Sequence, residues 1–261
     1  MKCRICGASV HAQFRHLLLE KHEVQYFQCD ACGLLQTEDP YWLAEAYEHA
    51  IATRDTGLVT RNLQLADMSA CILWRLYGRR GKFLDAGGGY GLFTRLMRDI
   101  GFDYYWWDEH AENLLARGFE GSPQSGPYLA VSAFEVLEHL NDPVGWLRSL
   151  REHTGCSTFI TSTELFSGPP PAPDQWWYYA FDTGQHITFF CQSALQALAN
   201  KLGLRLYSHR HLHIFTCERL SSLQFALMSR RRWSRLLSKV PKARLSSRVW
   251  SDSVLLSRTP S

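Results

Sequence analysis

FLDAGGGYGLF, residues 83–93, places four glycines in five positions between an apolar run and a helical pattern. The apolar run is typical of a buried strand, and it ends at Asp85. Gly87, Gly89 and Gly91 follow at alternate positions, and a tight glycine turn lets a ligand lie against bare backbone. The spacing D-x-G-x-G-x-G differs from the dinucleotide fingerprint G-x-G-x-x-G, so the turn predicts a ligand without identifying it.

Strand and helix patterns alternate on both sides of this turn, which predicts a parallel α/β sheet. Directly downstream we expect a helix over 91–101, a strand over 103–108 and a helix over 109–118. Further strands are predicted at 128–134, 156–163, 205–217 and 249–257, with helices at 142–153 and 193–203. Upstream of the turn, helical patterns cover about 41–50 and 58–77.

The strand that follows the glycine turn ends in Asp108, about twenty residues on, where a carboxylate can accept hydrogen bonds from both hydroxyls of a ribose. The fourth-strand segment AFEVLEHL, residues 133–140, is followed by Asp142-Pro143. Together with the glycine turn, these features resemble the class I S-adenosylmethionine-dependent methyltransferases over roughly residues 58–217. The resemblance implies a Rossmann-like, seven-stranded α/β sheet. The alternative is a glycine turn in another kind of α/β protein.

The same resemblance assigns a cofactor site. It implies that S-adenosylmethionine lies over the turn at residues 87–91, with its ribose at Asp108. Phe134 and Glu135 are expected near the methionine end of the cofactor. Asp85 is expected to steady the loop or the amino group of the ligand.

A histidine in the second half of the chain is the candidate catalytic residue. Methyl transfer requires the protein to hold the acceptor in line and to remove a proton from a hydroxyl or an acidic C–H. His186, in TGQHITFF, follows the fifth predicted strand and a proline-rich loop, where the resemblance implies the acceptor site. A similar E-H-I/V-x-x-F segment occurs in deoxysugar methyltransferases with N-terminal zinc cysteines, but Gln185 replaces the glutamate here. His186 then acts as a lone base or orients the substrate. The alternative is a histidine bonded to backbone at a strand edge.

The string EVLEH, residues 135–139, supports a second interpretation. Glu135, Glu138 and His139, with His186, are the ligand types of the metal site in small-RNA terminal 2′-O-methyltransferases. Positions i, i+3 and i+4 share a helical face, and oxygen with imidazole suits magnesium or manganese. The alternative is that these polar side chains cap and brace the loop.

Two further features lie close to the expected acceptor site. The aromatic run WWYY, residues 176–179, is either a lid whose rings stack on a sugar or base, or an ordinary hydrophobic plug. Glu164, at the end of the fifth predicted strand, either touches the acceptor or closes the strand.

Two C-x-x-C-G motifs near the N-terminus predict a zinc ribbon. Cys3, Cys6, Cys29 and Cys32 have the spacings of tetrahedral zinc, and four thiolates leave no open position, so the zinc is expected to be structural. The glycine after each pair suits a knuckle turn that aims backbone N–H groups at the sulfurs. The alternative is four buried cysteines without a metal.

The positive charge of the chain is concentrated near its C-terminal end. The net charge is +3, but residues 219–248 carry nine Lys or Arg and no Asp or Glu. Within this segment Trp233, Leu236, Leu237 and Val240 form one helical stripe before Pro241. The segment is suited to an anionic membrane surface, to RNA phosphates, or to a pyrophosphate-bearing or lipid-linked substrate. The alternative is that its stripe packs on the domain.

These patterns predict three units: a zinc-ribbon module at 1–38, a helical linker or lid at 39–80, and a Rossmann-like domain at 81–261 with a basic helical insertion at 219–248. No apolar run is long enough for a transmembrane segment, and the N-terminus lacks an apolar signal region, so a cytoplasmic location is expected.

The expected function is S-adenosylmethionine-dependent methyl transfer to a hydroxyl or carbon of a sugar, nucleotide-sugar or other small polar metabolite. One alternative is a metal-assisted RNA ribose 2′-O-methyltransferase. The other is a non-catalytic binding module that keeps the nucleoside-binding fold.

Overall fold

The computed structural model of the protein describes residues 1–47 and 56–258. Its strands are β1 (Val10–Leu18), β2 (His22–Cys29), β3 (Leu35–Thr37), β4 (Lys82–Ala86), β5 (Asp103–Trp107), β6 (Ala130–Phe134), β7 (Thr158–Ser162), β8 (Leu165–Phe166), β9 (Thr188–Cys191), β10 (Arg205–His209) and β11 (Leu212–Thr216). Its α-helices are α1 (Leu43–Ala46), α2 (Leu58–Tyr77), α3 (Leu92–Ile100), α4 (Pro143–Thr154), α5 (Gln192–Leu202), α6 (Ser222–Met228), α7 (Arg231–Leu237), α8 (Lys239–Arg244) and α9 (Val249–Leu256).

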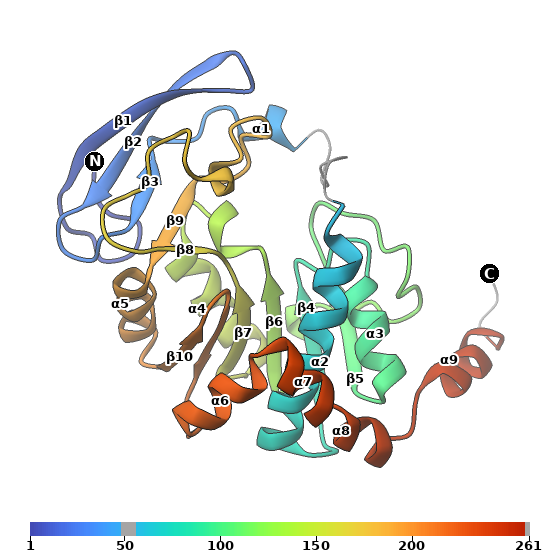
Figure 1. Cartoon of the computed structure of the whole chain (residues 1–261). Coiled ribbons are helices and arrows are strands. Elements are labelled where there is room, and N and C mark those ends of the chain that lie inside the picture. The colour runs from blue at the N-terminus through green and yellow to red at the C-terminus, as the bar shows by residue number, and fades with distance from the viewer. Residues whose placement is uncertain (48–55, 259–261) are drawn as a thin grey trace.

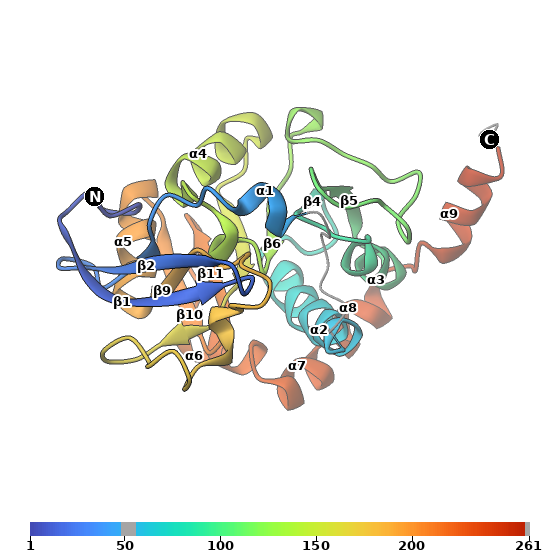
Figure 2. The same ribbon diagram turned by 90° about the horizontal axis from the view of Figure 1, so that it is seen from above.

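The main sheet has the strand order β10-β11-β7-β6-β4-β5 (Figure 1). The strands β5, β4, β6 and β7 are parallel, whereas β11 is antiparallel to β7 and β10 is antiparallel to β11. Helices α2 and α7 lie on one side of this sheet and α4 on the other (Figure 2). The carboxyl ends of β4, β5 and β6 therefore open onto one edge, which is where parallel α/β folds bind ligands.

The outer edge beside β5 differs from the prediction. The resemblance implied seven strands and the pattern implied a helix over 109–118, but the described sheet has six strands, and 109–118 is irregular. A single bridge between Trp106 and Glu120 stands beside β5. The Asp108 side chain accepts hydrogen bonds from the backbone N–H groups of His110 and Ala111, so the chain turns directly after β5.

The C-terminal end of the sheet also differs from the prediction. The single strand expected over 205–217 is a hairpin, with Arg210 at φ 55° in the turn between β10 and β11. The strand expected over 249–257 is helix α9 instead. Because the hairpin supplies both of the last two strands, the basic residues 219–248 follow the sheet as α6–α8 and are not inserted between its last two strands.

The remaining predicted elements lie close to their expected positions. Helix α2 has the predicted bounds, and β6, β7, α4 and α5 agree within a few residues. Helix α1 occupies the middle of the predicted 41–50 segment, of which 48–50 lies outside the described residues. None of the described helices is long and apolar enough to cross a membrane.

The N-terminal cysteine segment is joined to the α/β domain by a second sheet, in the order β1-β2-β3-β9-β8. Strand β3 pairs with β9 through Leu35 opposite Phe189 and Gln36 opposite Thr188. The buried guanidinium of Arg4 donates to the carbonyl oxygens of Ile187, Thr37 and Glu38. The segment is thus hydrogen-bonded to the chain that directly follows His186.

Candidate functional site

A cavity of about 960 Å³ lies at the carboxyl ends of β4, β5 and β6. One end is formed by the glycine turn and the residues after β5, and the other by the loops that carry His139 and His186. Nearly all the predicted ligand-binding residues line it, namely Asp85, Gly87, Gly89, Asp108, Phe134, Glu135, His139, Glu164 and His186. Gly91 lies just behind the turn, at the start of α3.

The glycine turn presents bare backbone to the cavity. Gly87, Gly89 and Gly91 have φ values of 73°, 52° and 83°, in the left-handed region that favours glycine. A Cβ on Gly88 would lie 2.6 Å from Cδ1 of Trp106, and one on Gly87 would lie 2.6 Å from Cγ2 of Val136. Packing therefore excludes a side chain at Gly87 and Gly88, and the backbone conformation disfavours one at Gly87, Gly89 and Gly91.

Asp85 stabilises the base of this turn. Its carboxylate accepts hydrogen bonds from the hydroxyls of Ser132 at 2.7 Å and Thr94 at 3.0 Å. Burial raises the pKa of Asp85 to about 7, because the charged form is poorly solvated there. A cationic group placed beside Asp85 would favour its charged form, which is what an amino group of a ligand supplies.

Asp108 links the glycine turn to the loop after β5. Its Oδ2 accepts from the backbone N–H of Gly89 at 2.8 Å, and its Oδ1 accepts from His110 and Ala111, each at 2.8 Å. A carboxylate offers about four lone-pair sites, so about one stays available to a ligand hydroxyl. Asp108 faces the cavity while its position is fixed by the backbone of both loops.

Glu135 occupies a strained backbone position at the end of β6. Its φ is 53°, a region that residues other than glycine rarely adopt and that clusters at functional sites. The hydroxyl of Ser162 donates to its Oε1 at 2.6 Å and accepts from its backbone N–H at 3.0 Å. Desolvation raises the pKa of Glu135. Beside it, Phe134 packs edge-on against Phe93 with ring centroids 4.7 Å apart.

Two histidines face each other across the opposite end of the cavity. His186 Nδ1 lies 2.7 Å from the carbonyl oxygen of Tyr178, and His139 Nδ1 lies 3.1 Å from that of Gln185. A carbonyl only accepts, so each Nδ1 carries the proton and each Nε2 keeps a lone pair. Desolvation lowers the pKa of His186 to about 4 and that of His139 to about 3, so both rings are neutral at pH 7.

Gln185 holds a different role from the glutamate that it replaces. Its side-chain amide donates to the carbonyl oxygen of Ala46 at 2.8 Å, so it fixes α1 next to the cavity. It also presents its backbone carbonyl to His139. The amide cannot form a carboxylate–histidine dyad with His186.

The structure brings together only part of the second predicted metal set. Ligand atoms of Glu138, His139 and His186 lie within 4.8 Å of one another, and Glu135 is not in this group. Glu138 is fully buried, with one carboxylate oxygen accepting from the hydroxyl of Tyr178 and Oε2 without a hydrogen-bond partner. Burial raises the pKa of Glu138 well above its usual value.

The aromatic run divides into the two predicted roles. Trp177 is 77% exposed and lines the cavity, as a lid residue would. Tyr178 and Tyr179 are 1% and 0% exposed and pack in the core, as a plug would. Tyr178 does both, because its ring also lines the cavity and lies 4.6 Å from the His186 ring.

The four N-terminal cysteines form a compact cluster. Their sulfurs lie within 4.8 Å of one another, with Cys3 and Cys32 3.6 Å apart and Cys6 and Cys29 3.4 Å apart. Tetrahedral ligands at about 2.3 Å from zinc are about 3.8 Å apart, so the sulfur positions fit that ion. The backbone N–H groups of Ile5 and Cys32 point at cysteine sulfurs, as the knuckle prediction requires.

The family model described as a methyltransferase domain matches residues 63–209. The chain belongs to this methyltransferase family. The match covers the glycine turn, Asp108, the EVLEH string and His186, so most of the residues that line the cavity lie in the methyltransferase domain. Of the curated proteins, none matches the sequence.

Solved structures similar to this methyltransferase include the following three. The mitomycin 7-O-methyltransferase MmcR is 18% identical with a TM-score of 0.43, over 58% of this chain and 52% of its own. TnmH is 19% identical with a TM-score of 0.48, over 69% and 61%. Magnesium protoporphyrin IX methyltransferase from Synechocystis PCC 6803, solved with bound SAH, is 15% identical with a TM-score of 0.41, over 66% and 90%. The chain thus spans only about half of MmcR and three fifths of TnmH.

Three residues near the methyltransferase cavity were not predicted. Tyr47 lines it and stacks on His110 with ring centroids 5.0 Å apart, and Trp146 lines it from α4. Arg4 acts from outside, through Ile187. No local pattern marks these residues, because each reaches the site through tertiary contacts. The one available signal is the position of Arg4 between two predicted zinc ligands, where its charged side chain needs hydrogen-bond partners from the protein.

Proposed function

We propose that the protein transfers a methyl group from S-adenosylmethionine to a hydroxyl or carbon of a sugar, nucleotide-sugar or other small polar metabolite. The observation that carries this proposal is a single cavity with a bare glycine turn and Asp108 at one end and the free Nε2 atoms of His139 and His186 at the other. When bound, the cofactor supplies the electrophilic methyl group. Its nucleoside fits against the backbone of residues 87–89, with Asp108 accepting from a ribose hydroxyl.

His186 is the proposed base. Its Nδ1–H is held by the Tyr178 carbonyl, which fixes the ring and leaves the Nε2 lone pair to accept a proton. A neutral imidazole accepts the proton that the acceptor loses as the methyl group arrives. The low pKa of His186 makes it a weak base, so positioning of the acceptor carries much of the rate enhancement.

The cavity supports a small polar acceptor. Its volume is close to the upper end of the range for small-molecule sites, which leaves room for a nucleoside cofactor and one modest acceptor. Trp177 and Tyr178 line the same cavity as Glu135 and Glu164. Aromatic rings can stack on a sugar ring, and carboxylates can accept hydrogen bonds from its hydroxyls.

We further propose that the cysteine cluster holds one structural zinc ion, because four thiolates at tetrahedral spacing leave no open coordination position. Two C-x-x-C pairs of this kind suit a reducing compartment, which supports a cytoplasmic location. We also propose that the basic segment 219–248 binds an anionic partner.

The test is a calorimetric titration of metal-analysed protein with S-adenosylhomocysteine, with Asp108→Ala beside it. We expect saturable binding to the wild-type chain and a loss of about ten- to a hundredfold in affinity for the variant, because a charge-assisted hydrogen bond is lost. Glu112→Ala, an exposed acidic residue outside the cavity, is the matched control. Absence of binding to the wild-type chain would overturn the proposal in favour of the non-catalytic binding module.

The metal-assisted RNA 2′-O-methyltransferase is a second candidate, favoured by the Glu138–His139–His186 cluster and the unpartnered Oε2 of Glu138. Turnover of a ribose acceptor that is lost on chelation and restored by Mg²⁺ or Mn²⁺, with zinc still bound to the cysteines, supports this candidate. Turnover of a small acceptor that is unchanged by chelation excludes it.

A further inference from the structure

Helix α7 carries its apolar stripe away from the body of the protein. Ser234 and Ser238 are buried against α2, where the carbonyl of Ser234 accepts from the Cys71 thiol and the Ser238 hydroxyl donates to Asp67 at 2.7 Å. Trp233 and Leu236, on the other side, are 48% and 52% exposed. A surface helix normally buries its apolar stripe and exposes its serines, so this helix has the reverse arrangement.

The exposed stripe is part of a larger apolar surface. Of the nineteen large apolar side chains that are exposed among the described residues, nine lie between Leu223 and Leu256. Helices α6, α7 and α8 run in a row along one face of the molecule, and α9 extends beyond the β5 edge (Figures 1 and 2). A concentration of apolar side chains on one face of a water-exposed protein marks an interaction surface.

The same helices carry the uncompensated positive charge. Only two of the nine cations in residues 219–248 form ion pairs within the described parts of the chain: Lys242 with Asp67 at 2.6 Å, and Arg248 with Asp103 at 3.3 Å. Those that are exposed on α7 and α8 without such a pair are Arg231, Arg232, Arg235, Lys239 and Arg244. Helices α7 and α8 thus expose both apolar and cationic side chains.

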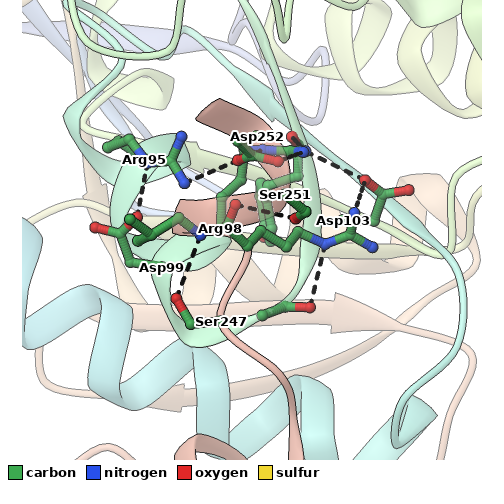
Figure 3. A network of polar contacts seen from close by, with 11 residues as sticks. Arg95, Arg98, Asp99, Asp103, Ser247, Ser251 and Asp252 are labelled. Atoms are coloured by element: carbon green, nitrogen blue, oxygen red, sulfur yellow. Dashed lines mark hydrogen bonds and ion pairs between the residues drawn. The ribbon is translucent and has the colours of Figure 1, made fainter. Parts of the chain in front are cut away.

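Buried polar contacts anchor this surface to the α/β domain. Asp252, on α9, accepts from the Arg98 guanidinium at 2.7 and 2.8 Å and from Arg95 at 2.9 Å (Figure 3). Asp252 is 3% exposed, whereas Trp250 and Val249 on the same helix are 78% and 55% exposed. Helix α9 therefore turns its acidic side chain inward, while Val249 and Trp250 lie at the surface.

We propose that helices α6–α9 form a docking surface for an anionic lipid bilayer. Leucine, valine and tryptophan side chains gain free energy by entering the boundary between headgroups and acyl chains, while neighbouring arginines contact lipid phosphates. The phosphates of an RNA backbone would pair with the arginines, but they would not bury the leucine and valine side chains. A second copy of the chain, related by two-fold symmetry, would place cations of this surface opposite cations.

The experiment is flotation of the full chain with vesicles of pure phosphatidylcholine or of phosphatidylcholine containing about 25% phosphatidylglycerol. We expect binding to the anionic vesicles only, weakened by salt because the Debye length shortens. The combined variant Arg231→Glu, Arg232→Glu and Arg235→Glu should lower the partition coefficient about tenfold or more, and Leu236→Glu should also lower it.

Each variant has a matched control elsewhere on the surface. The control for Leu236→Glu is Leu17→Glu, at a leucine on β1 that is 48% exposed. The control for the combined arginine variant is Arg79→Glu with Arg80→Glu, which reverses two exposed charges just after α2. Unchanged binding of S-adenosylhomocysteine shows that the variants are folded and separates this test from that of the methyltransferase activity. The proposal is overturned by equal binding to neutral vesicles, or by control variants that lose as much binding as α7 variants. It is also overturned if the protein does not bind vesicles but binds single-stranded RNA, or forms a concentration-dependent dimer, and the α7 variants abolish that RNA binding or that dimer.

Discussion

The two ends of the cavity are built in different ways. The cofactor end consists of consecutive residues on β4, its turn and the turn after β5, and Asp108 joins them through backbone hydrogen bonds. The acceptor end is assembled from distant parts of the chain: His139 is held by the Gln185 carbonyl, and Arg4 holds the Ile187 carbonyl across 183 positions. The first end is therefore fixed by local backbone geometry, and the second depends on tertiary contacts with the cysteine segment.

This difference gives the two ends different vulnerabilities. Changes in the N-terminal segment are expected to disturb the acceptor end and leave cofactor binding intact, because β3 pairs with β9, which follows His186. Changes at the base of the glycine turn are expected to act on the cofactor end and leave the histidines in place.

Removal of a zinc ligand is the substitution from which we expect the largest effect. We expect Cys3→Ala to reduce zinc from about one ion per chain to near zero and to lower Tm by about 10 °C, because the metal stabilises the segment that supports β9. Zinc content is measured by metal analysis and Tm by calorimetry. Cys217→Ala, at an exposed cysteine outside the cluster, is the control and should change neither. Full zinc content in Cys3→Ala would show that the cluster is not the binding site.

A second substitution acts on the chemistry of the acceptor end alone. We expect His186→Ala to lower turnover by about 10²- to 10⁴-fold, as the loss of a general base does, with affinity for S-adenosylhomocysteine nearly unchanged. Kinetics and calorimetry on one preparation separate the two effects. His153→Ala, at an exposed histidine on α4, is the control. A large loss of cofactor affinity instead would remove His186 from the acceptor role.

The residues of the proposed cofactor end could be placed from the sequence more fully than those of the proposed acceptor end. Four of the expected residues line the cavity, namely Asp85, Gly87, Gly89 and Asp108. They could be recognised because they lie in two short stretches of sequence, each at the end of a predicted strand. The sequence brought His139 and His186 together only through the resemblance to the small-RNA terminal 2′-O-methyltransferases. No local pattern reports their contact, because it depends on the packing of the chain before β9 against the loop after β6. The hairpin at Arg210 was missed since RLYSHRHLHIFT contains no glycine, proline or asparagine to mark a turn.

Arg4 tests whether the cysteine segment positions the acceptor end. We expect Arg4→Gln to lower the free energy of unfolding by about 2–4 kcal/mol, because it leaves the carbonyls of Ile187, Thr37 and Glu38 without their charged donor. Turnover should fall about tenfold with cofactor affinity unchanged. Arg15→Gln, exposed on β1, is the control for loss of a cation in the same segment. Unchanged zinc content with unchanged turnover would show that Arg4 stabilises the fold without positioning the site.

A substitution at Asp85 is expected to have the smallest effect, and this effect concerns the cofactor end. Its pKa is raised to about 7 by burial, above the value near 3.9 expected in the unfolded chain, so the folded state holds the extra proton between about pH 4 and 7. Stability contributed by the protonated form is therefore lost as pH rises through this window. We expect the unfolding free energy of the wild-type chain to fall by about 1–3 kcal/mol relative to Asp85→Asn between pH 5 and 8.

Denaturant midpoints at several pH values in one buffer series measure this difference, with Glu112→Gln as an exposed acidic control. Saturating S-adenosylhomocysteine should flatten the wild-type curve if its amino group lies beside Asp85, because a nearby cation favours the carboxylate. Equal pH slopes for the wild-type chain and Asp85→Asn would mean that the carboxylate is charged in the free protein. The hydrogen bonds from Ser132 and Thr94 would then outweigh the desolvation of Asp85, and its role would be to brace the turn before any ligand arrives.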